Sequence, residues 1–153
     1  MINVQKGKFV AITPPGAIID DASATTTAID TKGWDYCQIV VLLGATDIAM
    51  TALKVQESND DGSTDTYADV TGLLFGASTN VAGSTSTLPS ATDDNKFFIF
   101  EIDLRGRDRY LDLVATCGNG STGTYITAFA ILSRGEEAPV TAAQRGASQI
   151  LRV

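Results

Sequence analysis

Apolar and polar positions alternate in several short segments of the chain, and this two-residue period predicts β-strands. The two faces differ most clearly in residues 49–57, 96–104 and 109–116. Further strands are expected at residues 8–13, 17–19, 25–29, 36–43, 66–70 and 123–133. About eight short strands without a long helical period predict an all-β protein, an antiparallel β-sandwich that is jelly-roll-like.

One of these segments is apolar on both of its faces. Residues 39–43 read Ile-Val-Val-Leu-Leu without a polar interruption. Such a strand is either covered on both sides within the fold or lies at a contact between subunits. We therefore expect Ile39 and Val41 to lie at the seam of an oligomer.

Turn signals separate several of the predicted strands. Asp61-Gly62 and Asn119-Gly120 each lie between two strand patterns and predict hairpins, because these dipeptides readily adopt positive φ. Residues 72–95 form a long stretch rich in Ser, Thr and Gly, and a loop of that length inside a compact domain is often functional.

The 153 residues suit a single domain with extended arms at both ends. We expect an N-terminal arm and first strand at residues 1–15, the β-sandwich at 16–134 and a C-terminal arm at 135–153. The last segment is polar and Ala-rich, with at most a weak helix at residues 141–149.

Charge and composition narrow the classes of function. With 11 basic and 18 acidic residues the net charge is −7, which disfavours binding to nucleic acid. The absence of histidine rules out catalysis by Ser-His-Asp or Cys-His groups and His-ligated metals, so we expect no enzyme. No segment resembles a signal peptide or reaches the length of a membrane span, so synthesis in the cytoplasm without membrane association is expected.

The two cysteines, Cys37 and Cys117, both lie in apolar, strand-like runs. They could form a disulfide across the sandwich, but spacing alone does not show that they meet. Two buried free thiols are the favoured interpretation, because free cysteine behaves as a small apolar core residue.

Arg105, Arg107 and Arg109 form the one dense basic patch. Arginines two residues apart project to one side of an extended chain, where they could bind carboxylates on a partner. The alternative, at even weight, is internal pairing with neighbouring acidic residues of the patch. These are Asp103, Asp108 and Asp112.

Two further features carry weaker chemical signals. The acidic residues 57–62 resemble the start of a calcium loop, but the position of the bidentate Glu is Ala68, so a solvated hairpin turn is favoured. Trp34 could stack on a sugar ring, although a single Trp beside an apolar strand more often packs in the core or an interface. No metal or cofactor is expected.

The order of several motifs resembles that of a phage protein family. LKVQES at residues 53–58, an Asp-Gly turn and YADVTG at 67–72 are followed by IDLRGR at 102–107, RYL at 109–111 and LSR at 132–134. This pattern is similar to the small decoration (cement) proteins of tailed bacteriophage heads. The resemblance covers residues 36–134.

The resemblance implies a non-enzymatic β protein on the outer surface of the capsid. It would be synthesised in the host cytoplasm, bind the major capsid protein and associate with itself, as a homotrimer rather than a homodimer. The expected interface comprises the N-terminal arm, the strand at the oligomer seam, the arginine patch and Trp34. Its residues are Val4, Lys6, Lys8, Phe9, Ile39, Val41, Arg105, Arg107, Arg109 and Trp34.

Three alternatives remain. A structural protein of the phage tail or neck would share much of this pattern. A carbohydrate-binding adhesive module would use Trp34, with calcium in the acidic turn. A hydrolase would need Asp and Glu pairs that converge about 5–10 Å apart, which nothing in the sequence requires.

Overall fold

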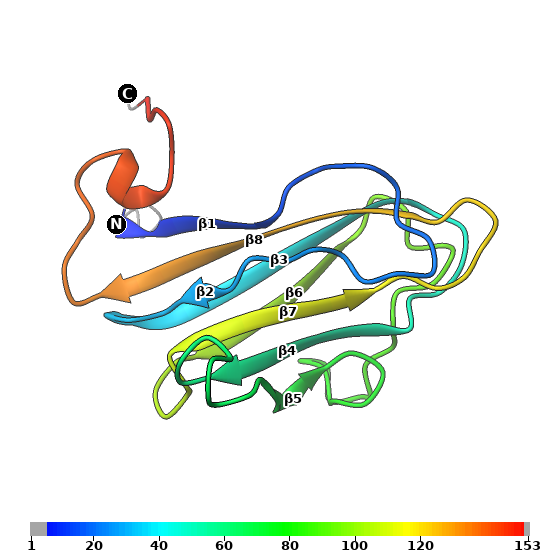
Figure 1. Ribbon diagram of the computed structural model, residues 1–153, viewed down its shortest axis with the longest axis horizontal. Helices are drawn as coiled ribbons and strands as arrows, with labels where there is room; N and C mark the ends of the chain where they lie inside the picture. Colours follow the sequence, from blue (N-terminus) through cyan, green and yellow to red (C-terminus); the bar gives the residue numbers. More distant parts are fainter. Residues whose placement is uncertain (1–5, 152–153) are drawn as a thin grey trace.

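The computed structural model describes residues 6–151, which form a sandwich of two four-stranded antiparallel sheets (Figure 1). Sheet A has the order β1 (Lys8–Thr13), β8 (Thr124–Gly135), β3 (Trp34–Thr46) and β6 (Phe97–Asp103). Sheet B has the order β2 (Ile29–Asp30), β7 (Tyr110–Thr116), β4 (Ala52–Ser58) and β5 (Ala68–Leu74). The predicted all-β, antiparallel β-sandwich is confirmed.

The hydrophobic core lies between the sheets and is built from alternate residues of each strand. Ile39 and Val41 of β3 are fully buried, as are Val55 of β4, Leu111 of β7 and Leu132 of β8. Burying each such side chain stabilises the fold by roughly 1.5–3 kcal/mol relative to exposure. Ile39 and Val41 therefore face the core rather than a subunit seam, and only the other side of β3 is available to a partner.

The strands pair in a nested order: β1 with β8, β2 with β7, β3 with β6 and β4 with β5. Only β4 and β5 are both neighbours in sequence and neighbours in a sheet. Each of the other connections between consecutive described strands crosses from one sheet to the other. The fold is therefore dominated by pairing between distant parts of the chain.

The hairpin predicted at Asn119-Gly120 is wrong. The strand before it, β7, belongs to sheet B, whereas the strand after it, β8, belongs to sheet A. The loop crosses between the sheets and is held by acidic side chains, because the N–H groups of Gly120 and Ser121 donate to the carboxylates of Asp20 and Asp47.

The hairpin predicted at Asp61-Gly62 is confirmed, because β4 pairs with β5. Asp61 and Gly62 both have positive φ, at 60° and 73°. The carboxylate of Asp60 accepts hydrogen bonds from the backbone N–H groups of Ser63, Thr64 and Asp65. This acidic segment therefore uses its side chains to close its own turn.

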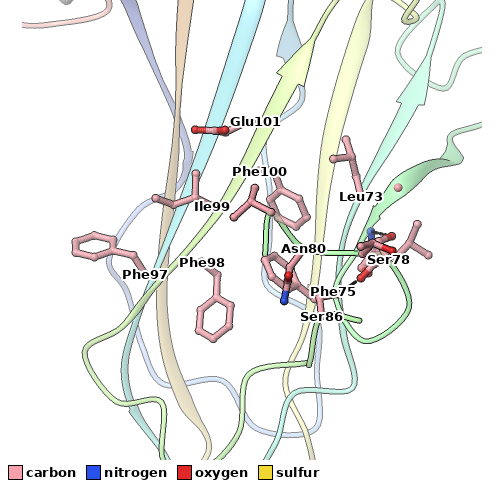
Figure 2. Close-up of a pocket in the computed structure, with 14 residues that line it drawn as sticks. Leu73, Phe75, Ser78, Asn80, Ser86, Phe97, Phe98, Ile99, Phe100 and Glu101 are labelled. Carbon is pink, nitrogen blue, oxygen red and sulfur yellow. Dashed lines mark hydrogen bonds between the residues drawn. The ribbon is translucent and has the colours of Figure 1, made fainter. Parts of the chain in front are cut away.

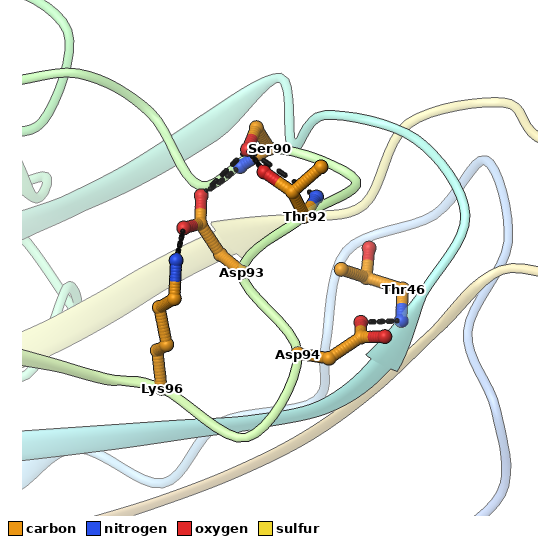
Figure 3. A network of polar contacts seen from close by, with 6 residues as sticks. All are labelled: Thr46, Ser90, Thr92, Asp93, Asp94 and Lys96. Carbon is orange, nitrogen blue, oxygen red and sulfur yellow. Dashed lines mark hydrogen bonds and ion pairs between the residues drawn. The ribbon is translucent and has the colours of Figure 1, made fainter.

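The long segment between β5 and β6 is an ordered loop fixed at both ends. Near its start the Ser86 hydroxyl, which is buried, donates to the carbonyl of Ser78. Near its end the Asp93 carboxylate accepts from the N–H of Ser90 at 2.6 Å and from Lys96 Nζ at 2.8 Å, while Asp94 accepts from the N–H of Thr46 (Figure 3). These contacts fix the point at which β6 begins.

The four edge strands of the two sheets differ in regularity. β1 has a register shift between Ala11 and Thr13, and β2 is only two residues long. The pairing of β5 with β4 has a register shift between Lys54 and Gln56, and the shifted part of β5 contains Gly72, whose φ is 92°. β6 pairs with β3 without any shift over its whole length. It is the only regular edge among the described strands.

Residues 6–8 and 143–146, near the two limits of the described chain, lie beside each other at β1 (Figure 1). The N-terminal segment enters sheet A as β1, and Val4 lies outside the described residues. The weak helix at 141–149 is reduced to the 3₁₀ turn η2 (Ala143–Arg145). η2 packs on β1, with Arg145 buried and its Nε donating to the Gly7 carbonyl. Among the described residues, no helix has the length and apolar character needed to cross a membrane.

Candidate functional site

The outer face of sheet A, which we call the apolar face, carries large hydrophobic side chains. The alternation of side chains along a strand creates this face, because the odd-numbered residues at the start of β6 point away from the core. The register places them beside outward-pointing residues of β3, which in turn lie beside outward-pointing residues of β8. Its members are Phe9, Val40, Leu42, Phe97, Ile99, Phe129 and Ile131. Phe97 and Ile99 are 61% and 45% exposed, so the face is open to solvent.

The apolar face is continuous across the sheet. Val40 pairs with Phe129 on one side and with Ile99 on the other. The side chains of directly opposed residues lie about 4.5–5.5 Å apart at Cβ, close enough to touch. Val40 is only 7% exposed because its larger neighbours cover it. Large exposed apolar patches on folded proteins mark interaction sites.

Polar residues lie at one end of this face. Gln38 Nε2 donates to the Glu101 carboxylate, and the guanidinium of Arg134 lies 5.5 Å from the centre of the Tyr36 ring. A hollow of about 330 Å³ is lined by residues of this end that include Tyr36, Gln38, Glu101 and Ile131. The face therefore offers both an apolar area and a polar border to a partner, as protein interfaces do.

The outer face of sheet B has the opposite character. Lys54 Nζ lies 2.6 Å from Asp69 Oδ1, which also accepts a hydrogen bond from Gln56 Nε2 at 2.7 Å. The Thr26 hydroxyl donates to the Asp112 carboxylate at 2.8 Å. Lys54, with Gln56 next, lowers the pKa of Asp69 below its ordinary value of 3.8. The polar groups of this face are thus largely satisfied by one another.

The three arginines of the predicted patch bind three separate acidic residues. Arg105 contacts Asp103 in β6, Arg107 Nη1 lies 3.2 Å from Glu57 Oε1 in β4, and Arg109 binds Asp30 in β2 through two hydrogen bonds of 2.7 and 2.8 Å. Of the predicted internal partners Asp103 is found, whereas Asp108 and Asp112 are not partners. The arginines therefore do not form a single fork toward a carboxylate.

The ion pairs lower the pKa of the acidic partners. Hydrogen bonds from Arg105 bring the pKa of Asp103 down to about 2, and those from Arg109 lower that of Asp30 despite partial burial. Lys8, the first residue of β1, also lowers the pKa of Asp30 slightly through its positive charge. Of the three arginine side chains, that of Arg105 is the most exposed to solvent, at 78%.

Trp34 is half-buried at the start of β3 and packs against the core. Its ring lies over Gly135, where an added Cβ would come within 2.9 Å of the indole. Because Trp34 packs against the core and against the backbone of β8, less of its ring is available to a sugar. Lys6, by contrast, is exposed just before β1.

Neither the acidic turn nor the cysteines form a binding centre. Within residues 6–151 no group of three or more His, Cys, Asp or Glu side chains could hold a metal ion. Cys37 and Cys117 are free and buried, which agrees with the favoured interpretation of two thiols. Burial raises the pKa of the Cys37 thiol to about 12, so it is protonated and unreactive at neutral pH.

A second apolar feature, the edge groove, lies between the edge strands β5 and β6 (Figure 2). It has a volume of about 530 Å³. Phe75 forms its floor and makes edge-to-face contacts with Phe98 and Phe100, with ring centres 5.4 and 5.0 Å apart. Val81, from the long loop, borders it and is fully exposed. Part of the stretch at residues 72–95 thus lines the groove.

Phe97, Ile99 and the edge groove were missed at the level of sequence. The signal for the first two was present, because the run Phe97–Phe98–Ile99–Phe100 is apolar on both faces, like residues 39–43. The groove had no such signal, because it depends on the irregular pairing of β5.

Comparisons of the chain with protein-family models, with curated proteins and with solved structures found no match. The functional argument therefore depends on the surfaces described above.

Proposed function

We propose that this protein acts by binding, as a structural subunit that docks through its apolar face onto a larger protein assembly. The exposed, continuous apolar surface of sheet A carries the proposal. Leaving Phe97 and Ile99 in water is unfavourable by roughly 25 cal/mol for each Å² of apolar area, and a partner that covers them removes this cost.

We propose further that the assembly is the head of a tailed bacteriophage, with the protein as a decoration protein on the capsid surface. The sequence resemblance supports this, and the nested pairing of eight strands supports reading the sandwich as a jelly roll. The major capsid protein is the proposed partner, with self-association as a homotrimer. The net charge of −7 favours the outer surface of the shell over the side that faces packaged DNA.

The arginine end of the sandwich provides a second contact in this proposal. The Arg105 guanidinium remains largely exposed although it pairs with Asp103, and it can add hydrogen bonds to a carboxylate of the partner. A tail or neck protein would use the same surfaces. The carbohydrate-binding alternative has less support, because Trp34 is half-buried against the core and contacts Gly135.

The test uses phage heads that lack this protein. We expect the purified protein to sediment with them at a fixed ratio to the capsid subunit and to raise their bursting temperature. The variant Phe97→Lys/Ile99→Lys, which places two charges on the apolar face, should lose occupancy. The matched control Gln56→Lys/Thr116→Lys adds the same charges to the outer face of sheet B and should bind as the wild type does.

Two results would contradict the proposal in different ways. Equal binding by both variants would show that the apolar face is not the docking surface. A wild-type protein that remains free of heads would refute the capsid assignment and would favour the tail or glycan alternatives.

A further inference from the structure

Within residues 6–151, the open edge of β6 presents backbone groups at alternate residues that pair with no other strand. The N–H of Leu43 donates to the carbonyl of Lys96, and the N–H of Leu104 donates to the carbonyl of Asp35. In an antiparallel ladder the hydrogen-bonded positions alternate, so the backbone N–H and C=O groups of the even-numbered residues of β6 point toward β3. The N–H and C=O groups of Phe97, Ile99 and Glu101 therefore point outward, where the sheet order places no further strand.

This edge lacks most of the features that normally block strand addition. Natural edge strands are protected by being short, by bulges, or by charged side chains or proline on the edge, and the two charged residues of β6, Glu101 and Asp103, follow an uncharged run at Phe97–Phe100. β1, β2 and β5 are short or irregular in this way, whereas β6 is regular and its seven residues include no lysine or proline. The sequence Phe-Phe-Ile-Phe at its start is also strongly β-forming.

The edge groove lies directly beside this open edge (Figure 2). A strand added along β6 would extend sheet A and direct every second side chain into the groove, against Phe75 and Phe98. The volume of about 530 Å³ is within the range of roughly 300–1,000 Å³ for ligand sites. The groove therefore suits a peptide in which alternate residues are apolar.

The segment at residues 147–153 has the length, pattern and charge of such a strand. It has seven residues, like β6, and ends in Ile-Leu-Arg-Val. Leu151 is 97% exposed, with its apolar side chain in solvent. Arg152 is the one charged residue of the segment, whereas β6 carries two acidic residues, Glu101 and Asp103, and no basic one.

We propose that residues 147–153 of one copy add as an extra strand along β6 of a second copy. A parallel register with Ile150 beside Ile99 places Arg152 beside Glu101. Leu151, on the other face of the added strand, then points into the edge groove. Backbone hydrogen bonds supply affinity in this mode, and the side chains in the groove supply specificity.

The segment cannot reach β6 of its own chain in this way. Gly146 lies against β1, because a Cβ on it would come within 1.9 Å of the Phe9 carbonyl oxygen. β1 and β6 are opposite edges of sheet A, so a strand beyond β6 lies about 19 Å away at 4.7–4.9 Å per strand spacing. Crossing that distance uses about six residues at 3.3 Å each and leaves too few to pair with β6.

This inference deepens the self-association in the proposed function and rests on it for the presence of several copies. Each contact joins the segment of one copy to the edge of the next, so the contact is head-to-tail. Such contacts close into a ring when the rotation between copies allows it. A trimer is one such ring.

Cysteine cross-linking of the full chain tests the geometry. We expect Ile99→Cys/Ile150→Cys to form covalent dimers and larger species under mild oxidation, seen on a non-reducing gel. The native thiols do not interfere, because Cys37 and Cys117 are buried. The control pairs Ile150→Cys with Thr25→Cys, an exposed position beside β7, and should remain monomeric. An intrachain cross-link, no cross-link, or equal cross-linking in the control would overturn the inference.

A charge exchange tests the partner assignment. Truncation after Gly146 should abolish self-association measured by light scattering, and Arg152→Glu should weaken it severalfold. Adding Glu101→Arg to Arg152→Glu should restore it. Unchanged association in the truncated protein would overturn the inference. Head binding by the same proteins is measured separately by sedimentation, so a failure of the proposed function is distinguished from a failure of the strand exchange.

Discussion

The two sheets of the sandwich bury similar inner faces but have opposite outer faces. Sheet B covers its outer side with polar groups that bind one another, such as Lys54 and Asp69. Sheet A presents Phe97, Ile99 and their neighbours to solvent, and its polar contacts lie toward the ends of its strands. The polar groups on the outer side of sheet B thus bind one another, whereas the apolar side chains on the outer side of sheet A are open to solvent.

The largest expected effect is on the free energy of unfolding, which should depend on whether a substitution lies on the inner or the outer side of β3. Ile39→Ala removes a fully buried side chain and should lower the free energy of unfolding by about 2–5 kcal/mol. Leu42→Ala lies on the apolar face and should cost clearly less in the isolated monomer. Urea unfolding at low protein concentration measures both. Equal losses would mean that the apolar face is already covered in the monomer, which would remove the contrast with sheet B.

Many of the strands were accessible from the sequence, because strand alternation is local. The patterns of residues 8–13, 96–104 and 109–116 predicted strands that the structure contains within one residue at each end. They also separated the two faces of residues 96–104 and 109–116, since period two needs no knowledge of the partner strand. The sequence also showed that residues 39–43 of β3 are apolar on both faces of the strand.

The strand partners and the site were not accessible, because they depend on distant parts of the chain. Asn119-Gly120 has the local chemistry of a hairpin, yet β7 and β8 find their partners in different sheets. Arg109 lies 79 positions from its partner Asp30 in the chain, so neighbouring acids were poor guides to the ion pair. The edge groove forms only where the irregular β5 comes close to β6.

A smaller effect is expected where polar contacts fix the start of β6. Asp93→Asn loses the charge that binds Lys96 Nζ and weakens the contacts with Ser90 (Figure 3), so it should lower stability by about 1 kcal/mol at pH 7. Lys96, with Ser90 next, holds the pKa of Asp93 at about 2, below its ordinary 3.8. The stabilisation is therefore complete above pH 3.8 and is lost as the pH falls through about 2.

Thermal unfolding of the wild type and Asp93→Asn at pH 7, 4 and 2 measures this dependence. The difference in melting temperature between the wild type and Asp93→Asn should persist at pH 4 and become smaller toward pH 2. Ser63→Ala, in the distant β4–β5 turn, keeps every carboxylate and should show no such narrowing. A constant difference across the series would show that the charge of Asp93 does not anchor the loop.

The smallest expected loss of stability comes from a substitution on the outer, polar face of sheet B. Asp69→Asn removes the charge that Lys54 binds, but the pair is exposed, so the loss of stability should be smaller than for Asp93→Asn and should shrink in high salt. Lys54 and Gln56 lower the pKa of Asp69, so its contribution is present above pH 3.8 and is lost as the pH falls through the lower pKa of the folded state. Melting curves at two salt concentrations measure it, with Asp35→Asn as an exposed control. If salt leaves the Asp69→Asn difference unchanged, charge pairing does not stabilise sheet B, and the contrast between the two faces is one of hydrophobicity alone.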